Sequence, residues 1–190
     1  MAELKLETER LVLRHARPDD LDLWLNHLNA PEVMARLGGA RSPEEVEASF
    51  ARMLANEADG EFPFLVVTLK SDRTAIGKCG LARIAEKGAP VMIAGDVQIG
   101  WSLRADHWGQ GYAREAAEAV LAHAFADLGL GTVFGQTSES NPASWGLMRR
   151  LGMTRAEELD YSDPDFPPED NPTMVWRLDR SNWQAAREAA

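Results

Sequence analysis

The chain has 190 residues, 45% of them hydrophobic, which suffices for one core and is short for two domains, so we expect a single domain spanning 1–190. Its formal net charge of −10 at pH 7 disfavours nucleic-acid binding and favours cationic partners such as amines. No apolar run approaches the ~20 residues that cross a bilayer. The start shows no secretory signal, so we expect a cytoplasmic protein without a membrane partner.

Cysteine and histidine usage does not indicate a metal site. Cys79 is the single cysteine, which excludes an internal disulfide and predicts a small buried strand residue. The four histidines, His15, His27, His107 and His123, are scattered, and we expect none to pair with a carboxylate at helical spacing. We therefore expect no metal.

The N-terminal part predicts one strand and two helices. Residues 10–14 alternate apolar and charged side chains, as a half-buried strand does. Residues 18–20 open a helix whose apolar positions up to Leu28 follow helical spacing. Ser42, Pro43 and Glu45 form a capping box, and the helix that it starts should run to about Asp59.

The rest of the chain alternates strands with helices. Residues 64–70 and 75–84 predict a hairpin, and residues 93–103 predict a third strand of the same meander. A helix over 113–128 stops at Gly129. Further on we expect a strand at 132–137, a helix at 143–151, a strand at 153–159, a surface loop at 160–172 and a last strand at 173–178. This order is α+β, with a parallel junction where a helix crosses between neighbouring strands.

The stretch between the third strand and the long helix carries the chemistry. A loop with Gly109 and Gly111 leads directly into the helix, whose first N–H groups are unpaired and carry the positive end of its dipole. A diphosphate fits such a cradle, although two glycines can also serve only a tight turn. Neither a Walker loop nor a dinucleotide-binding glycine pattern is present.

The residues around this loop resemble a known motif. Gly100-Trp101-x-Leu103, followed by Trp108-Gly109-Gln110-Gly111-Tyr112-Ala113-Arg114-Glu115-Ala116, is similar to motif A of GCN5-related N-acetyltransferases (GNAT), in the form typical of RimJ/RimL-like members. The resemblance implies a three-layer α/β/α fold, with a mostly antiparallel twisted sheet, a splayed parallel pair of strands and about four helices. It also implies that acetyl-CoA is the co-substrate. The residues implied to bind it here are Trp101, Ser102 and Leu103 along the pantetheine arm, and Trp108, Gly109, Gln110, Gly111, Tyr112, Ala113 and Arg114 around the pyrophosphate.

A second match lies downstream. Asn141-Pro142-Ala143-Ser144, followed by Leu151-Gly152-Met153, resembles the family's Asn-x-x-Ser and Leu-Gly-Phe/Met signature. The resemblance implies that Asn141 bonds the pantetheine or holds the splayed strands apart, and that Ser144 lies near the thioester sulfur. The alternative is a simple helix entry, because both residue types are favoured at caps.

The proton-handling residues depart from the family pattern. Gln98 stands where many members have a glutamate, and Met148 stands where many relatives have a tyrosine acid. The base is left open among Asp96, which should share a strand face with Gln98, and Glu139 and Glu157. Ser144 is then the preferred proton donor to the sulfur.

The resemblance implies an N-acetyltransferase that moves an acetyl group from acetyl-CoA to a primary amine by direct attack, with a protein N-terminus or a small-molecule amine as acceptor. The alternatives are an inactive acyl-CoA-binding module and a scaffolding protein. Trp24 and the loop 160–172 could wall the acceptor side, and the loop's acids could attract a cation or be merely solvated; those acids are Asp160, Asp163, Asp165, Glu169 and Asp170. A homodimer is left open.

Overall fold

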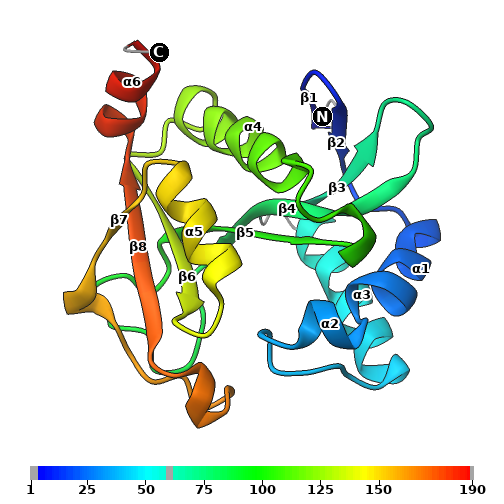
Figure 1. The fold of residues 1–190 in the computed structure, drawn as a ribbon, viewed down its shortest axis with the longest axis horizontal. Helices are drawn as coiled ribbons and strands as arrows, with labels where there is room; N and C mark the ends of the chain where they lie inside the picture. The colour runs from blue at the N-terminus through cyan, green and yellow to red at the C-terminus, as the bar shows by residue number, and fades with distance from the viewer. Residues whose placement is uncertain (1–3, 59–61, 189–190) are drawn as a thin grey trace. The chain divides into compact units, whose positions relative to one another are not determined.

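The structure is a computed structural model that describes residues 4–58 and 62–188. It divides into two compact units: unit 1 comprises Met1–Ala82 and Gly100–Val120, and unit 2 comprises Arg83–Ile99 and Leu121–Ala190. Eight strands are hydrogen-bonded in the order β1-β2-β3-β4-β5-β6-β8-β7, and β5 (Val97–Leu103) has residues in both units (Figure 1). The pairs β1–β2, β2–β3, β3–β4, β6–β8 and β7–β8 are antiparallel and β5 pairs with β6 in parallel, so the predicted α+β class is confirmed.

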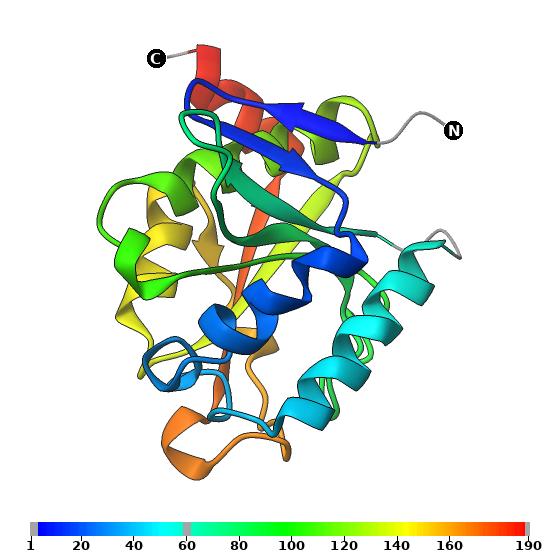
Figure 2. The same cartoon turned by 90° about the vertical axis from the view of Figure 1, so that its right-hand side faces the viewer.

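The other strands of unit 1 form an antiparallel ladder, which Figure 2 shows in blue and green. They are β1 (Lys5–Glu7), β2 (Leu11–Arg14), β3 (Phe64–Leu69) and β4 (Ala75–Arg83). In β2, Leu11 and Leu13 are fully buried while their neighbours are half-buried, which is the alternation that predicted the strand. The predicted hairpin of β3 and β4 is confirmed, whereas β1 was not predicted.

Five helices precede β3 in unit 1, and three of them, α1, η2 and α3, contribute to one apolar cluster. The five are η1 (Pro18–Asp20), α1 (Leu21–Leu23), η2 (Trp24–Leu28), α2 (Pro31–Met34) and α3 (Pro43–Ala58). The first three are successive 3-10, α and π turns, so the predicted helix from Pro18 forms but is irregular. The capping box is confirmed, because Ser42 N donates to Glu45 Oε2 at 2.9 Å and Glu45 N donates to Ser42 Oγ at 3.3 Å. Asp59, the predicted end, lies outside the described residues.

Trp24 belongs to this core and not to an exposed wall. Its side chain is 7% exposed, and its ring centroid lies 4.8 Å from that of Phe50. The expectation that Trp24 walls the acceptor side is therefore wrong. The helical spacing that places Leu28 in the cluster also turns Trp24 inward.

The long helix α4 (Tyr112–Ala126) is close to its predicted range. The predicted apolar stripe is buried at Ala116, Ala117 and Val120, and at the following positions of the same helix. Gly129 follows with a φ of 69°, the left-handed conformation that suits the end of a helix.

Unit 2 contains the parallel pair. Its strands besides β5 are β6 (Thr132–Ser138), β7 (Thr154–Arg155) and β8 (Thr173–Asp179), and its other helices are α5 (Pro142–Arg150), η4 (Glu157–Leu159), η5 (Pro168–Asp170) and α6 (Arg180–Glu188). β5 pairs with β6 in parallel at Gln98 opposite Phe134, which confirms the predicted parallel junction. β6 and β8 pair antiparallel along their whole length. The helix α6, drawn in red in Figure 1, was not predicted.

Three predictions fail for local reasons. The third strand starts at Val97 and not at residue 93, because the backbone turns at Pro90, which accepts from Ile93 N and Ala94 N. The strand predicted at 153–159 is reduced to β7, because a 3-10 turn follows. The histidine expectation is wrong for His123, whose Nδ1 lies 2.7 Å from Asp127 Oδ2 one helical turn on. Cys79 is buried in β4 as predicted, and burial raises the pKa of its thiol.

None of the described helices is long and apolar enough to span a bilayer.

Candidate functional site

The loop between β5 and α4 has free backbone donors. Gly109 and Gly111 have φ values of 74° and 83°, in the left-handed region that favours glycine. Within the described part of the chain, the N–H groups of Gly109, Gln110 and Gly111 donate to no protein acceptor. Trp108 Nε1 donates to Leu103 O at 2.9 Å, which ties the loop to the end of β5. The loop therefore offers unpaired donors at the N-terminus of α4, the arrangement that binds anions.

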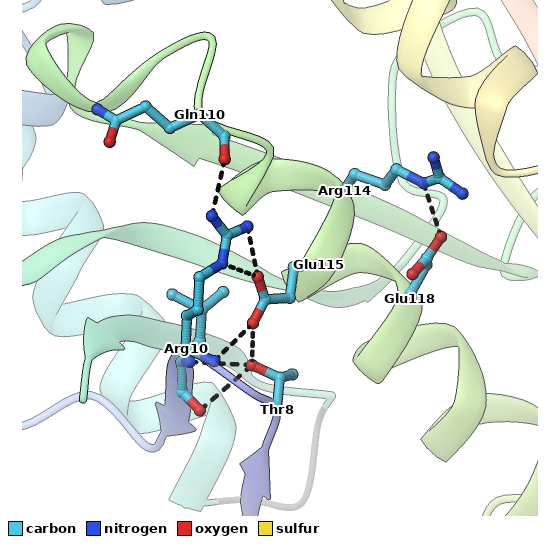
Figure 3. A network of polar contacts seen from close by, with 7 residues as sticks. Thr8, Arg10, Gln110, Arg114, Glu115 and Glu118 are labelled. Carbon is cyan, nitrogen blue, oxygen red and sulfur yellow. Dashed lines mark hydrogen bonds and ion pairs between the residues drawn. The ribbon is translucent and has the colours of Figure 1, made fainter. Parts of the chain in front are cut away.

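A half-buried carboxylate, Glu115, clamps this loop to the N-terminal strands (Figure 3). Glu115 accepts from Thr8 Oγ1 at 2.6 Å, from Arg10 N at 2.9 Å and from Arg10 Nε at 2.7 Å. Arg10 Nη1 also donates to Gln110 O at 3.0 Å, inside the loop itself. Burial alone would raise the pKa of Glu115, but the bonds from Thr8 and Arg10 outweigh it and hold the pKa below its ordinary value. No local sequence pattern indicates this clamp, because its partners are 105 and 107 residues apart.

Arginine side chains surround the start of α4. Arg114 is exposed, and its Nε donates to Glu118 Oε1 at 2.8 Å, one turn further along the helix (Figure 3). The guanidinium of Arg10 lies 4.5 Å from the ring centroid of Tyr112. The residues predicted around the pyrophosphate thus form the end of the loop and the first turn of α4, all in unit 1. Trp101, Ser102 and Leu103 lie directly before the loop, on β5.

Asn141 and Ser144 lie in unit 2 at the start of α5. Asn141 Oδ1 accepts from Ser144 N at 3.2 Å, so Asn141 acts as the helix cap. The alternative interpretation, in which Asn141 only caps the helix, is therefore confirmed for its side-chain oxygen. Among the described residues, neither Asn141 Nδ2 nor Ser144 Oγ makes a hydrogen bond, so both remain available to a ligand.

Met148 is a core residue. It is 2% exposed, and a Cβ at Gly135 would lie 3.1 Å from its Cε. Because Gly135 has no side chain, there is space beside β6, and the Met148 side chain fills it. A phenol at this position would be turned into the core.

The three candidate bases are isolated carboxylates. Asp96, Glu139 and Glu157 are exposed, and in the described part of the chain their carboxylates make no hydrogen bond. Asp96 does not share a strand face with Gln98, since it lies in the turn before β5; that expectation is wrong. The structure does not bring the three together.

Gln98 belongs to a polar network that sequence analysis missed. Gln98 Nε2 donates to Glu86 Oε1 at 2.6 Å, and Gln136 Nε2 donates to Gln98 Oε1 at 2.8 Å. Tyr161 Oη donates to Gln136 Oε1 at 2.5 Å. Gln98 and Gln136 lie on the neighbouring strands β5 and β6, but Glu86 lies in a loop without periodicity, so no pattern indicated it.

The acids of the loop 160–172 are mostly committed to the fold, contrary to a purely solvated surface loop. Asp163 and Asp170 are 3% and 4% exposed. Asp163 Oδ1 accepts from Asp165 N, Asp170 accepts from Ser140 Oγ, and Asp160 pairs with Arg155. These carboxylates hold the loop in place, so they do not form a free cation-attracting surface.

One further charged group, Lys78, is half-buried in unit 1. Lys78 Nζ lies 4.9 Å from the ring centroid of Phe64 and 5.8 Å from that of Trp24. Burial, with the nearby charge of Arg41, lowers the pKa of Lys78 to about 8. No group of three or more metal-ligating side chains occurs within residues 4–58 and 62–188.

Fold and loop together define an α+β protein in which β5 leads, through a loop with unpaired backbone donors, into a long helix. A family model described as an acetyltransferase (GNAT) domain matches residues 10–154. The chain therefore belongs to the GNAT family of N-acetyltransferases, enzymes that use acetyl-CoA, and the predicted family is confirmed.

Individual relatives agree with this assignment. The chain is 26% identical to the uncharacterized N-acetyltransferase p20 of Bacillus licheniformis over 159 residues, which cover 82% of this chain and 86% of p20. The crystal structure of an acetyltransferase from Agrobacterium tumefaciens is similar at a TM-score of 0.73 and 28% identity, covering 94% of this chain and 95% of that one. Spermidine N-acetyltransferase from Vibrio cholerae, in complex with CoA and spermine, has the same fold, with a TM-score of 0.70, 18% identity and coverage of 93% and 99%.

Proposed function

We propose that the whole chain, 1–190, acts as one RimJ/RimL-like acetyltransferase domain that moves the acetyl group of acetyl-CoA to a primary amine by direct attack. The observation that carries this proposal is the set of unpaired N–H donors at Gly109, Gln110 and Gly111, at the start of α4. A cradle of amides suits the pyrophosphate of CoA. The Trp-Gly-x-Gly-Tyr-Ala form of the loop supports the RimJ/RimL-like assignment.

The cofactor is held in this proposal by two sets of residues. Backbone groups of Trp101, Ser102 and Leu103 bind the pantetheine arm, and residues Trp108 to Arg114 bind the pyrophosphate. The family resemblance assigns Asn141 and Ser144 of unit 2 to cofactor binding as well, and neither Asn141 Nδ2 nor Ser144 Oγ has a protein partner among the described residues. Ser144 Oγ passes its proton to the leaving thiolate and takes up the second proton of the attacking nitrogen, so that the serine hydroxyl is regenerated.

The acceptor enters as a primary amine, either a protein N-terminus or a small molecule. The net charge of −10 favours cationic acceptors, and the shared fold with a spermidine acetyltransferase supports small amines. The amine must lose a proton before it attacks, because its reference pKa is ~8 to ~10.4. Asp96 or Glu139 accepts this proton through water, since both carboxylates are exposed and unpaired in the described part of the chain.

Two measurements test the proposal. Isothermal titration should show that acetyl-CoA binds the wild type and that Gly111→Trp abolishes binding; unchanged binding by the variant would contradict the cradle. Release of CoA thiol should then be followed with spermidine, benzylamine and a Ser-initiated tetrapeptide. Tight binding of acetyl-CoA without turnover on any amine would favour the alternative, an inactive acyl-CoA-binding module.

A further inference from the structure

Glu86 is the end point of a hydrogen-bond network in unit 2. Its Oε1 accepts from Gln98 Nε2 at 2.6 Å, and its Oε2 accepts from Ala85 N at 3.0 Å and from Gln136 Nε2 at 3.4 Å. Tyr161 in turn donates to Gln136 Oε1, and burial raises the pKa of this phenol, so it remains a donor. The network therefore orients both amides with their NH2 groups toward Glu86.

The charge of Glu86 is not balanced by a cation. Among the described residues it forms no ion pair, and its donors are neutral amides. The adjacent Lys87 pairs with Asp165 at 2.9 Å instead. A carboxylate offers about four lone-pair sites, and three donors leave one for a further donor. Glu86 is thus a held, half-buried anion with a remaining acceptor position.

The position of Gln98 relates this anion to the proposed reaction. Gln98 is the residue at which β5 pairs with β6, and it stands two positions before Gly100 on the strand that leads to the cofactor loop. Glu86 is bonded directly to its side chain. The loop that carries Glu86 also contacts the segment after Tyr161, since a Cβ at Gly88 would lie 2.5 Å from Ser162 O. The carboxylate is therefore held by Gln98, Gln136 and Ala85 N beside β5, the strand whose end is proposed to bind the pantetheine arm.

Resting on the proposed function, we infer that Glu86 binds the acceptor as its ammonium and so selects cationic amines. Gln98 and Gln136 act as positioning residues that aim the carboxylate. An acceptor ammonium supplies the donor and the charge that Glu86 lacks, and charge-assisted hydrogen bonds are the strong ones. A glutamate at position 98 would transfer protons. The amide of Gln98 instead supports acceptor binding, because it positions Glu86.

The test compares steady-state kinetics of wild type and Glu86→Gln with the best acceptor among spermidine, benzylamine and a Ser-initiated tetrapeptide. The variant keeps the shape of the side chain and removes its charge. KM for the amine should rise about 10- to 100-fold, as expected for one lost charge-assisted bond, while kcat and the affinity for acetyl-CoA stay within about threefold. The double variant Glu86→Gln with Gln98→Glu places a carboxylate on the other residue of the pair. Its KM for the amine should therefore fall back toward the wild-type value.

Glu158→Gln is the matched control, because Glu158 is exposed and lacks a hydrogen bond within the described residues, yet its substitution changes the net charge equally. An unchanged KM in Glu86→Gln would overturn the inference. A fall in kcat at constant KM would also overturn it, since it would assign Glu86 to proton transfer. If the wild type binds acetyl-CoA but acetylates no amine, the proposed function fails, and the role of Glu86 fails with it.

Discussion

Removing the carboxylate of Glu115 tests how the loop between β5 and α4 is held. Glu115→Ala deletes the acceptor of Thr8 Oγ1, Arg10 N and Arg10 Nε, all within 2.9 Å. Hydrogen bonds to a charged group contribute about 1.5–3 kcal/mol each, but these share one carboxylate and are not additive. The Arg10 side chain is 43% exposed, so solvent screening reduces the contribution of the Arg10–Glu115 ion pair to stability to about 0.5–1 kcal/mol. We expect the free energy of unfolding to fall by about 2–3 kcal/mol in total.

Urea unfolding at pH 7 measures this change, with Arg10→Ala as the matched variant. Arg10→Ala keeps the bonds from Thr8 and from the backbone of residue 10, so it should cost only about 1 kcal/mol. Equal losses in the two variants would refute the clamp. Because the pKa of Glu115 is lowered in the fold, its stabilisation is present above the ordinary carboxyl pKa of ~4.3 and is lost as the pH falls through the folded value. The gap between wild type and Glu115→Ala should therefore narrow in acid.

Three further substitutions address single residues. Lys78→Met should stabilise the protein by about 1–3 kcal/mol at pH 7. The wild type binds fewer protons folded than unfolded between pH 8 and ~10.4, so its unfolding free energy should rise over that range and the variant's should not. Gly111→Ala forces a side chain into a φ of 83°, and titration should show weaker acetyl-CoA binding, whereas Gly131→Ala, which meets no atom within 4 Å, should bind normally. Met148→Tyr should overpack against Gly135 and cost about 1–3 kcal/mol in urea unfolding, without raising kcat.

The elements predicted well are those in which one periodic pattern decides the structure. The stripe of α4 and the alternation of β2 each bury the expected residues, and the capping box at Ser42 fixes the start of α3. Short elements were missed where tertiary contacts decide instead. The three residues of β1 are a strand because they pair with β2, and the turn at Pro90 removes the start of a strand that composition favoured.

The candidate site was predictable where chemistry is local. Glycines directly before a helix indicate left-handed backbone conformations from the sequence alone, and Gly109 and Gly111 adopt such conformations. The clamp from Thr8 and Arg10 to Glu115 was not predictable, because a bond across about a hundred residues leaves no local pattern. The buried loop acids illustrate the same limit. Composition shows how many there are, but only the fold shows that Ser140 bonds to Asp170.

The residue that departs from the family pattern also shows why a single position is a poor guide to the charge of a site. Replacing a glutamate by Gln98 removes a carboxylate from the strand, yet the amide donates to Glu86, twelve positions earlier. A negative charge is therefore retained within one hydrogen bond of β5. An amide in place of a carboxylate cannot act as a base, but its NH2 group can orient a neighbouring carboxylate by donating a hydrogen bond to it. Loss of the glutamate and binding of a cationic acceptor are thus compatible at this strand, provided that Gln98 keeps its NH2 group turned toward Glu86.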